Sequence, residues 1–368
     1  MLSRTVVEKD ILQRNESDYS CCDILLFDEK LAFNFVFAIF CFIFLIAFVG
    51  IVSNICNVVI FYKHGFKDTV NISLFVLAIS DLCSILPLIW TGVLAEPRFL
   101  PYDVPFNGMD VQFLAGSWPH TCFARLTSWI TTYVMFERCL SIASPFKVKI
   151  FLTPRRVLCI HAVIQVLIVA GVVPTYCIYS LGWSYDPVYN KSLLSLQQTD
   201  NALEIANVTS VLNSFVSTLC SFVATAVCTS VIIIKLNQKT QWRISTTSVA
   251  IVNCALNTIT RKDRKAIKMV VIVSLVFLVT VSPSVILIII TVANEDFNMY
   301  GRLRNIFYVA YSFTFLLEAV NSSFNIIIYY TMNGRYRKTF KELFSIFCNL
   351  KNRKLKKKYL KKNNVNTQ

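Results

Sequence analysis

Long runs of apolar residues constrain this chain more than any other feature of its sequence. A helix needs about 20 consecutive apolar residues to cross the hydrocarbon core of a bilayer. Seven stretches meet that requirement and are separated by polar loops. They are residues 31–62, 70–94, 114–142, 157–181, 208–234, 269–292 and 305–331. The sequence therefore predicts an all-α membrane protein, a seven-transmembrane helix bundle.

Composition and the location of charge agree with a membrane protein. Only 15% of the residues are charged, whereas a soluble protein carries about a quarter. The net charge of +15 would suit nucleic acid. However, most of the 36 Lys and Arg residues fall in alternate loops and after Asn333. By the positive-inside rule these segments are cytoplasmic, which predicts a multi-pass plasma membrane protein with an extracellular N-terminus, a cytoplasmic C-terminus and no nucleic-acid partner.

Four regions follow from this pattern. We expect residues 1–30 to form an extracellular tail, 31–332 the bundle, 333–348 a short amphipathic eighth helix on the inner leaflet, and 349–368 a basic cytoplasmic tail. Three Asn-X-Ser/Thr acceptors for glycosylation fall on the predicted outer side, at Asn15, Asn190 and Asn207. Cys348, at the end of the amphipathic segment, is a candidate for acylation.

Charged residues inside the apolar runs are the main functional candidates, because a charge in hydrocarbon is costly and needs a partner. Glu137 and Arg138 close the third run at its cytoplasmic end. A plainer alternative is that they only mark where the helix leaves the bilayer. Asp81 lies deep in the second run, where it serves either a functional site or a structural hydrogen-bond hub.

Polar residues in the first and seventh runs are predicted to face the protein interior. Asn54 and Asn57 lie in the first run, where exposure to lipid would be expensive. In the seventh run, spacings of three and four residues place a polar stripe on one helix face. This stripe consists of Glu318, Asn321, Asn325 and Tyr329.

Helical geometry assigns depths to the remaining candidates. His120 precedes Arg138 by five full turns, about 27 Å, so both project from one face of the third helix. His120 is therefore a ligand-contact candidate, or an interfacial histidine at the mouth of the helix. Arg125 lies at a depth similar to that of Glu318, and we expect the two to pair across the bundle. Pro283 predicts a bend in the sixth helix.

These residues together resemble the rhodopsin-like (class A) G-protein-coupled receptors over about residues 31–348. The matching positions, in chain order, are Gly50, Asn54, Leu77, Asp81, the Glu137-Arg138-Cys139 triplet, Phe277, Pro283, Asn321, Asn325 and Tyr329. More narrowly, the segments 65–74 and 128–131 with Glu137-Arg138-Cys139-Leu140 resemble molluscan chemosensory receptors. The resemblance implies a receptor that senses an extracellular chemosensory cue or peptide and activates a heterotrimeric G protein.

The resemblance also implies residue roles. Arg138 would pair with Glu137 and with Asp263 of the sixth helix at rest, so Asp263→Ala would raise basal signalling, and Tyr329 would belong to the same activation switch. Phe277 and Pro283 would mark the bend of the sixth helix. Asn54, Asp81, Asn321 and Asn325 would form a mid-bundle polar cluster, which in many members holds sodium. No other cofactor and no metal site are expected.

Departures from the family pattern bear on its mechanism. Val281 stands in place of the usual tryptophan and Ile326 in place of the seventh-helix proline. The family disulfide at the top of the third helix would begin at Phe113, and residues 182–207 contain no cysteine. We therefore expect no such bridge. Other pairings remain open to the outer-side cysteines Cys21, Cys22, Cys122 and Cys177.

Other functions remain as alternatives. An amine ligand and a retinal Schiff base are disfavoured, because His120 and Ala319 occupy the positions that those ligands would need. A seven-helix binding protein without G-protein coupling would fit the replacements Val281 and Ile326. A transporter is less favoured, since the chain shows no internal repeat. An enzyme is not expected, because the three histidines are scattered.

Overall fold

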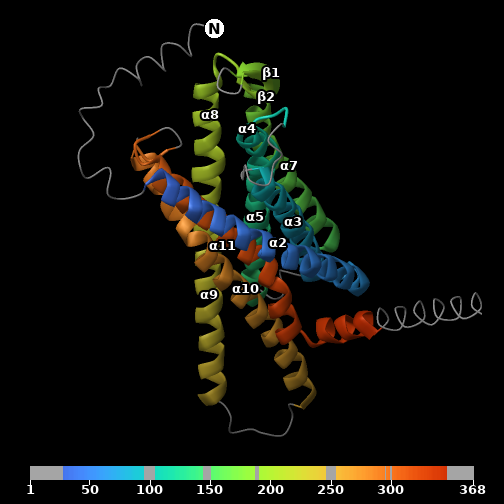
Figure 1. Cartoon of the computed structure of the whole chain (residues 1–368). Helices are drawn as coiled ribbons and strands as arrows, with labels where there is room; N and C mark the ends of the chain where they lie inside the picture. Colours follow the sequence, from blue (N-terminus) through green and yellow to red (C-terminus); the bar gives the residue numbers. More distant parts are fainter. Residues whose placement is uncertain are drawn as a thin grey trace, which may run out of the picture.

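The chain forms a bundle of long helices in a computed structural model (Figure 1). The structure describes residues 28–94, 104–143, 151–186, 190–245, 254–294, 296–298 and 301–345. Five of the described bundle helices, all except the third and the fifth, are single elements. They are α2 (Glu29–His64), α3 (Thr69–Leu94), α7 (Pro154–Ile178), α10 (Cys254–Ala293) and α11 (Arg304–Met332).

Two bundle helices are assembled from shorter pieces joined by a π turn. The third comprises α4 (Gly108–Gln112), η3 (Phe113–Ser117) and α5 (Trp118–Ala143). The fifth comprises α8 (Ala202–Ser210), η4 (Val211–Val216) and α9 (Ser217–Ser245). Both begin about one and a half turns before the start expected from the apolar runs. Each extra segment contains an acidic residue, Asp110 or Glu204, and lies outside the apolar stretches from which the boundaries were inferred.

The fifth and sixth helices also extend farther than their apolar runs. Helix α9 continues to Ser245, and α10 begins at Cys254 and ends at Ala293. In Figure 1 both helices project beyond the lower end of their neighbours. These extensions carry the basic residues that the sequence analysis placed in a loop, so the charged segment is largely helical.

A β-hairpin, absent from the expectations, links α7 to α8. Its antiparallel strands are β1 (Tyr179–Asp186) and β2 (Lys191–Gln198), paired from Tyr179 with Gln198 to Asp186 with Lys191. Asn190 lies in the turn with a φ of 49°, a conformation that asparagine tolerates better than most residues. The alternation of apolar and polar side chains in this segment was too weak to predict strands.

Burial in the bundle is inverted relative to a soluble protein. Large apolar side chains are exposed on the outer faces of the helices, as in Phe48, Val166 and Val279. Polar side chains such as Asn54 and Asp81 are fully buried. A lipid solvent requires this arrangement, because apolar side chains can face hydrocarbon whereas polar groups must find partners inside.

Only some helices would be recognised as membrane spans by length and composition alone. Among the described residues there are five such spans: Lys30–His64, Thr69–Trp90, Pro154–Ile178, Glu204–Gln238 and Ile267–Ala293. The other two bundle helices, α5 and α11, carry the buried polar side chains Glu137, His120, Asn321 and Asn325. These side chains face the interior, so they lower the mean hydropathy without contacting lipid.

Close packing of α2 on α11 depends on a glycine. A Cβ atom at Gly50 would lie 2.2 Å from the Ser323 hydroxyl oxygen and 2.7 Å from Ile85. The neighbouring Ser53 hydroxyl donates to the Ser323 carbonyl at 3.1 Å, which joins the two helices directly. The glycine therefore allows the backbones to approach closely enough for polar contacts between helices.

A short helix over residues 334–345, which we call the juxtamembrane helix, follows α11. In Figure 1 it leaves the end of α11 and points away from the bundle. Tyr336 is fully buried, whereas Arg335, Arg337, Lys338 and Lys341 are exposed. This division matches the amphipathic helix expected from the sequence. Cys348 and the basic tail fall outside the described residues.

Candidate functional site

Three polar clusters occupy the interior of the bundle at different depths. The middle cluster surrounds Asp81 of α3. Its Oδ1 accepts from the Thr127 hydroxyl of α5 at 3.1 Å, and its Oδ2 accepts from the Asn325 amide of α11 at 2.8 Å. Thr127 also bonds to the Ser80 hydroxyl at 2.8 Å. Asp81 therefore connects three helices through hydrogen bonds that satisfy its buried oxygens.

The first helix joins this middle cluster through backbone groups rather than by direct contact with Asp81. The Asn54 amide donates to the Ser322 carbonyl at 2.8 Å and to the Gly50 carbonyl at 3.0 Å. Asn321 is buried, and none of the described contacts joins it to Asp81. Within hydrogen-bond distance of the Asp81 carboxylate lie the Thr127 hydroxyl oxygen and the Asn325 amide nitrogen. Carboxylate and hydroxyl oxygens suit a hard cation, whereas an amide nitrogen does not, so the sodium site stays a prediction.

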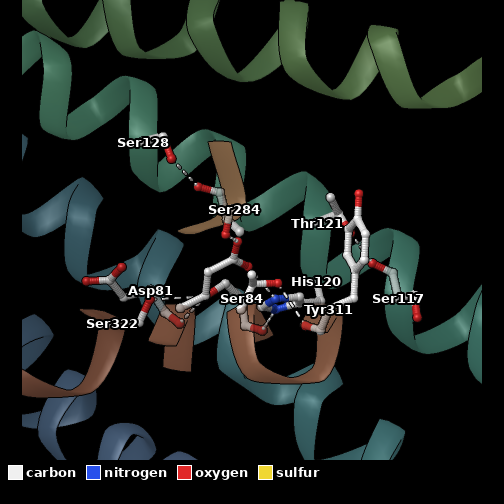
Figure 2. A network of polar contacts seen from close by, with 12 residues as sticks. Asp81, Ser84, Ser117, His120, Thr121, Ser128, Ser284, Tyr311 and Ser322 are labelled. Atoms are coloured by element: carbon white, nitrogen blue, oxygen red, sulfur yellow. Dashed lines mark hydrogen bonds and ion pairs between the residues drawn. The ribbon is translucent and has the colours of Figure 1, made fainter. Parts of the chain in front are cut away.

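The outer cluster centres on His120 and Glu318 (Figure 2). The His120 Nε2 lies 3.0 Å from the Glu318 Oε2, and its Nδ1 lies 2.8 Å from the Ser84 carbonyl oxygen of α3. The Ser284 hydroxyl of α10 donates to the Glu318 Oε1 at 3.2 Å. The Phe315 ring packs edge-on against the imidazole, with ring centroids 5.1 Å apart. Glu318 therefore ties together α5, α10 and α11.

Arg125 was expected to be the partner of Glu318. The structure gives Glu318 hydrogen bonds to His120 and Ser284, and its pairing with Arg125 stays a prediction. Arg125 is buried and lies within electrostatic range of both Glu318 and Tyr311. The structure thus brings all three predicted ligand-pocket residues together. The roles of Ser84 and Ser284 were not anticipated, because serines within apolar helices are common.

The outer and middle clusters are continuous. The Ser84 hydroxyl donates to the Asp81 carbonyl at 3.1 Å and lies 3.4 Å from the Ser322 hydroxyl. Figure 2 shows Asp81, Ser84 and Ser322 beside His120. A path of polar contacts therefore extends from the outer half of the bundle to its centre.

The third cluster, at the end of the bundle away from the hairpin, holds Glu137 against α3. Its carboxylate accepts a short hydrogen bond from the Thr69 hydroxyl and a longer one, 3.5 Å, from Ser73. The Arg138 guanidinium lies 3.7 Å from the same carboxylate. The Ser73 hydroxyl in turn contacts the Nε2 of the buried His161 of α7 at 3.0 Å. No pattern in the sequence predicted that Thr69, Ser73 or His161 would lie here.

The remaining predicted switch residues are only partly described. Asp263 lies within α10, but its side chain is not among those described, so its expected pairing with Arg138 falls outside the described residues. Tyr329 is buried between Phe61 and Tyr336, with ring centroids 5.2 and 5.7 Å away. The Tyr336 hydroxyl donates to the Asn57 Oδ1 at 2.6 Å.

The bend residues of α10 lie at a break in its hydrogen bonding. Pro283 has no N–H to offer the Val279 carbonyl, and the Ser282 hydroxyl donates to that carbonyl at 3.0 Å. Phe277 and Val281 are buried in a cluster with Leu219 of α9. The freed carbonyl is therefore satisfied by a nearby side chain, as expected for proline in a transmembrane helix.

The outer end of the third helix is anchored to the hairpin without a disulfide. The backbone N–H of Leu196 donates to the Asp110 Oδ2 at 2.9 Å. The backbones of Asn107 and Leu194 also pair, at 2.9 Å. Phe113, at the position where the family cysteine would fall, packs edge-on against Tyr179 with centroids 5.5 Å apart.

The predicted modification sites are only partly visible. Cys122 and Cys177 are free thiols. Asn190 is exposed in the hairpin turn, and its side-chain oxygen accepts a short hydrogen bond from the Tyr185 hydroxyl. Asn207 lies within α8 with its side chain outside the described set, and Asn15, Cys21 and Cys22 fall outside the described residues.

Comparison with known proteins places this geometry in context. A family model described as "Serpentine type 7TM GPCR chemoreceptor Srw" matches residues 41–347. Neuromedin-U receptor 2 of Homo sapiens is 29% identical over 140 residues, which cover 38% of this chain and 33% of the relative. The Mus musculus protein of the same name is 30% identical over 146 residues, 39% of this chain and 35% of the relative. The matched segment thus spans about a third of each relative.

Proposed function

Because the chain belongs to the Srw family of serpentine seven-transmembrane G-protein-coupled chemoreceptors, we propose that it senses an extracellular chemosensory cue or peptide and activates a heterotrimeric G protein. The family is one of multi-pass membrane receptors rather than enzymes. The observation that carries the proposal is the continuous polar interior, which begins at His120 and Glu318 and reaches the centre at Asp81. The Glu137-Arg138 pair lies beyond it at the cytoplasmic end.

In the proposed mechanism, ligand binds at the outer end of this polar interior and the G protein binds at its cytoplasmic end. An extracellular ligand that contacts His120, Arg125 or Glu318 would change how α5, α10 and α11 are held together. The bundle would exchange between a resting and an active state, and a ligand shifts that equilibrium only if it interacts differently with the two states. Glu318 allows such a difference, because its hydrogen bonds join all three helices. Outward movement of the cytoplasmic end of α10 would then open a site for the G protein.

The resting state would be held at the cytoplasmic end by the contacts of Glu137. Thr69 and Ser73 anchor the carboxylate to α3, so Arg138 is kept beside it. Asp263 would add a second partner from α10, and Asp263→Ala is expected to raise basal signalling. The oxygens around Asp81 would accept a sodium ion that favours this state.

Two similarities to known proteins favour different classes of ligand. The family description and the resemblance to molluscan chemosensory receptors favour an environmental cue. The relatives named as receptors for neuromedin U favour a neuropeptide. The orientation that we propose, with an extracellular N-terminus, exposes the hairpin and the outer cluster to either kind of ligand.

The experiment is expression in reporter cells challenged with peptide and water-borne chemical libraries and read out through several G-protein pathways. Wild type is expected to respond, and Arg138→Ala to reach the surface and bind the same ligand without a G-protein response. A ligand that binds wild type but evokes no response in any pathway would contradict coupling. That outcome would favour a seven-helix binding protein, the alternative suggested by the buried Val281 and by Ile326.

A further inference from the structure

The contact between His120 and Glu318 fixes where protons can lie. A carbonyl oxygen only accepts hydrogen bonds, so the His120 Nδ1 that lies 2.8 Å from the Ser84 carbonyl must carry a hydrogen. The other ring nitrogen, Nε2, faces the Glu318 Oε2 at 3.0 Å. Figure 2 shows His120 beside Ser84.

Hydrogen-bond chemistry then requires one further proton between the two side chains. An unprotonated Nε2 and a carboxylate oxygen are both acceptors and cannot bond to each other. The observed contact exists either as an imidazolium beside a carboxylate or as a neutral imidazole beside a carboxylic acid. In both forms the closed pair holds one proton more than a neutral histidine beside a carboxylate.

Other charged and titratable groups surround this pair. Arg125 of α5 lies within electrostatic range of Glu318. Ser284 of α10 donates to the other carboxylate oxygen. Further titratable groups nearby, among the described residues, are Tyr311 of α11 and Cys122 of α5, which both act on Arg125, and Asp81 of α3 on the inner side.

Access to solvent differs between the two partners. The His120 side chain is 1% exposed, whereas that of Glu318 is 22% exposed. A proton can therefore arrive through Glu318 while the imidazole stays buried. Four helices converge here, because Ser84 lies on α3, His120 on α5, Ser284 on α10 and Glu318 on α11.

We propose that His120 and Glu318 form a proton-binding site, so that external protons act as a second ligand and hold α5 against α11. Loss of the proton leaves two acceptors facing each other, one of them on the buried imidazole, and the pair must separate. The closed arrangement is therefore favoured at low pH and lost as pH rises. For one proton, the ratio of closed to separated forms changes by at most about tenfold per pH unit.

The first test is thermal unfolding of the purified receptor in lipid nanodiscs between about pH 5 and about pH 8, the range in which histidines titrate. The midpoint for wild type is expected to fall as pH rises. Glu318→Gln keeps every hydrogen bond, because its amide donates to the neutral imidazole and its oxygen still accepts from Ser284. It should therefore fold and lose that pH dependence.

Glu204→Gln is the matched control, since it makes the same substitution at an exposed acid of α8 outside the cluster and should keep the wild-type profile. A Glu318→Gln profile that still follows that of wild type would overturn the proposal. Should Glu318→Gln fail to fold, ¹⁵N NMR of the three histidines in wild type decides. His120 should carry its hydrogen on Nδ1 throughout, and a tautomer protonated only on Nε2 would overturn the assignment.

The consequence for signalling rests on the proposed function. Basal and ligand-evoked signalling of wild type should vary with external pH, and Glu318→Gln should remove that variation. The unfolding and NMR measurements need no G protein. A receptor that shows the expected unfolding profile but never couples would therefore contradict the proposed function and leave the proton site supported.

Discussion

At the scale of single residues, hydroxyl groups determine where the charged side chains lie. Glu137 is 1% exposed, and its carboxylate is positioned by Thr69 and Ser73 of α3 as well as by Arg138. Asp81 depends similarly on Thr127. A hydroxyl is small enough to pack between helices and can satisfy a carboxylate without adding a charge, which explains its use inside an apolar bundle.

Replacing Thr69 by valine tests whether its hydrogen bond restrains the Glu137 carboxylate. The change preserves shape and removes one hydrogen bond to a charged group, worth about 1.5 kcal/mol or roughly a tenfold shift in an equilibrium. We expect Thr69→Val to raise basal G-protein signalling several-fold, because Arg138 is then released more easily. The measurement is nucleotide exchange on the G protein without ligand.

The control for this change is Thr331→Val. The Thr331 hydroxyl bonds only to carbonyls of its own helix among the described contacts. It should leave basal exchange unchanged. Equal basal exchange in Thr69→Val and wild type, at equal surface expression, would show that α3 does not restrain Glu137.

At the scale of elements, a buried hydroxyl of the juxtamembrane helix connects it to the polar interior of the bundle. The Tyr336 hydroxyl donates to Asn57, whose amide donates to Asn54, whose own amide reaches the Ser322 carbonyl of α11. Burial raises the pKa of the Tyr336 phenol, so it remains a neutral donor. This relay connects the juxtamembrane helix through α2 to the middle cluster.

Tyr336→Phe removes the hydroxyl and keeps the ring contacts with Phe61 and Tyr329. Because the buried Asn57 oxygen loses its donor, we expect the free energy of unfolding to fall by about 1–3 kcal/mol. Chemical unfolding in mild detergent measures the change. Tyr330→Phe, which alters a tyrosine held by ring packing on Phe340, should have little effect. Equal losses in both variants would refute the relay.

The hairpin is the second element with a specific anchor. Asp110→Ala removes the acceptor for the Leu196 N–H, whereas the backbone pairing of Asn107 with Leu194 remains. We expect amide exchange at Leu196 to quicken by about tenfold, since a hydrogen bond to a charged group is worth about 1.5 kcal/mol.

Asp200→Ala, an exposed acid just after β2, serves as the comparison and should not alter the exchange rate. Unchanged exchange in Asp110→Ala would mean that the side chain does not anchor the strand. Because Phe113, which packs on Tyr179, occupies the position of the family cysteine, a reducing agent should not change the exchange rate at Leu196 in wild type or in Asp110→Ala.

At the scale of the whole molecule, the sequence predicted the seven-helix bundle but not all of its details. Helical periodicity and the free-energy cost of exposing a polar side chain to lipid were enough to predict that Asn54, Asn57, Asp81 and Asn325 face the interior. The contact of Glu318 with His120 was not predicted, because the estimated depths placed Arg125 rather than His120 level with Glu318. Which α5 side chains reach Glu318 also depends on the tilt and rotation of the helices, which tertiary packing determines.

The hairpin and the polar extensions of the helices were missed for a different reason. They lie outside the apolar runs, where hydropathy carries no signal and local propensity is weak. Helices α5 and α11 show the opposite problem, because hydropathy alone would not identify them as membrane spans. Their inward polar side chains lower the hydropathy of two helices that the fold nevertheless requires to cross the membrane.

Whether α5 crosses the membrane is the most direct test of the seven-helix arrangement. If α5 did not cross, α7 would return the chain inward and the hairpin would be cytoplasmic. We expect an epitope inserted after the exposed Asn190 to be stained by antibody on intact cells, whereas a C-terminal epitope is stained only after permeabilisation. Staining of the hairpin epitope only in permeabilised cells would contradict the arrangement.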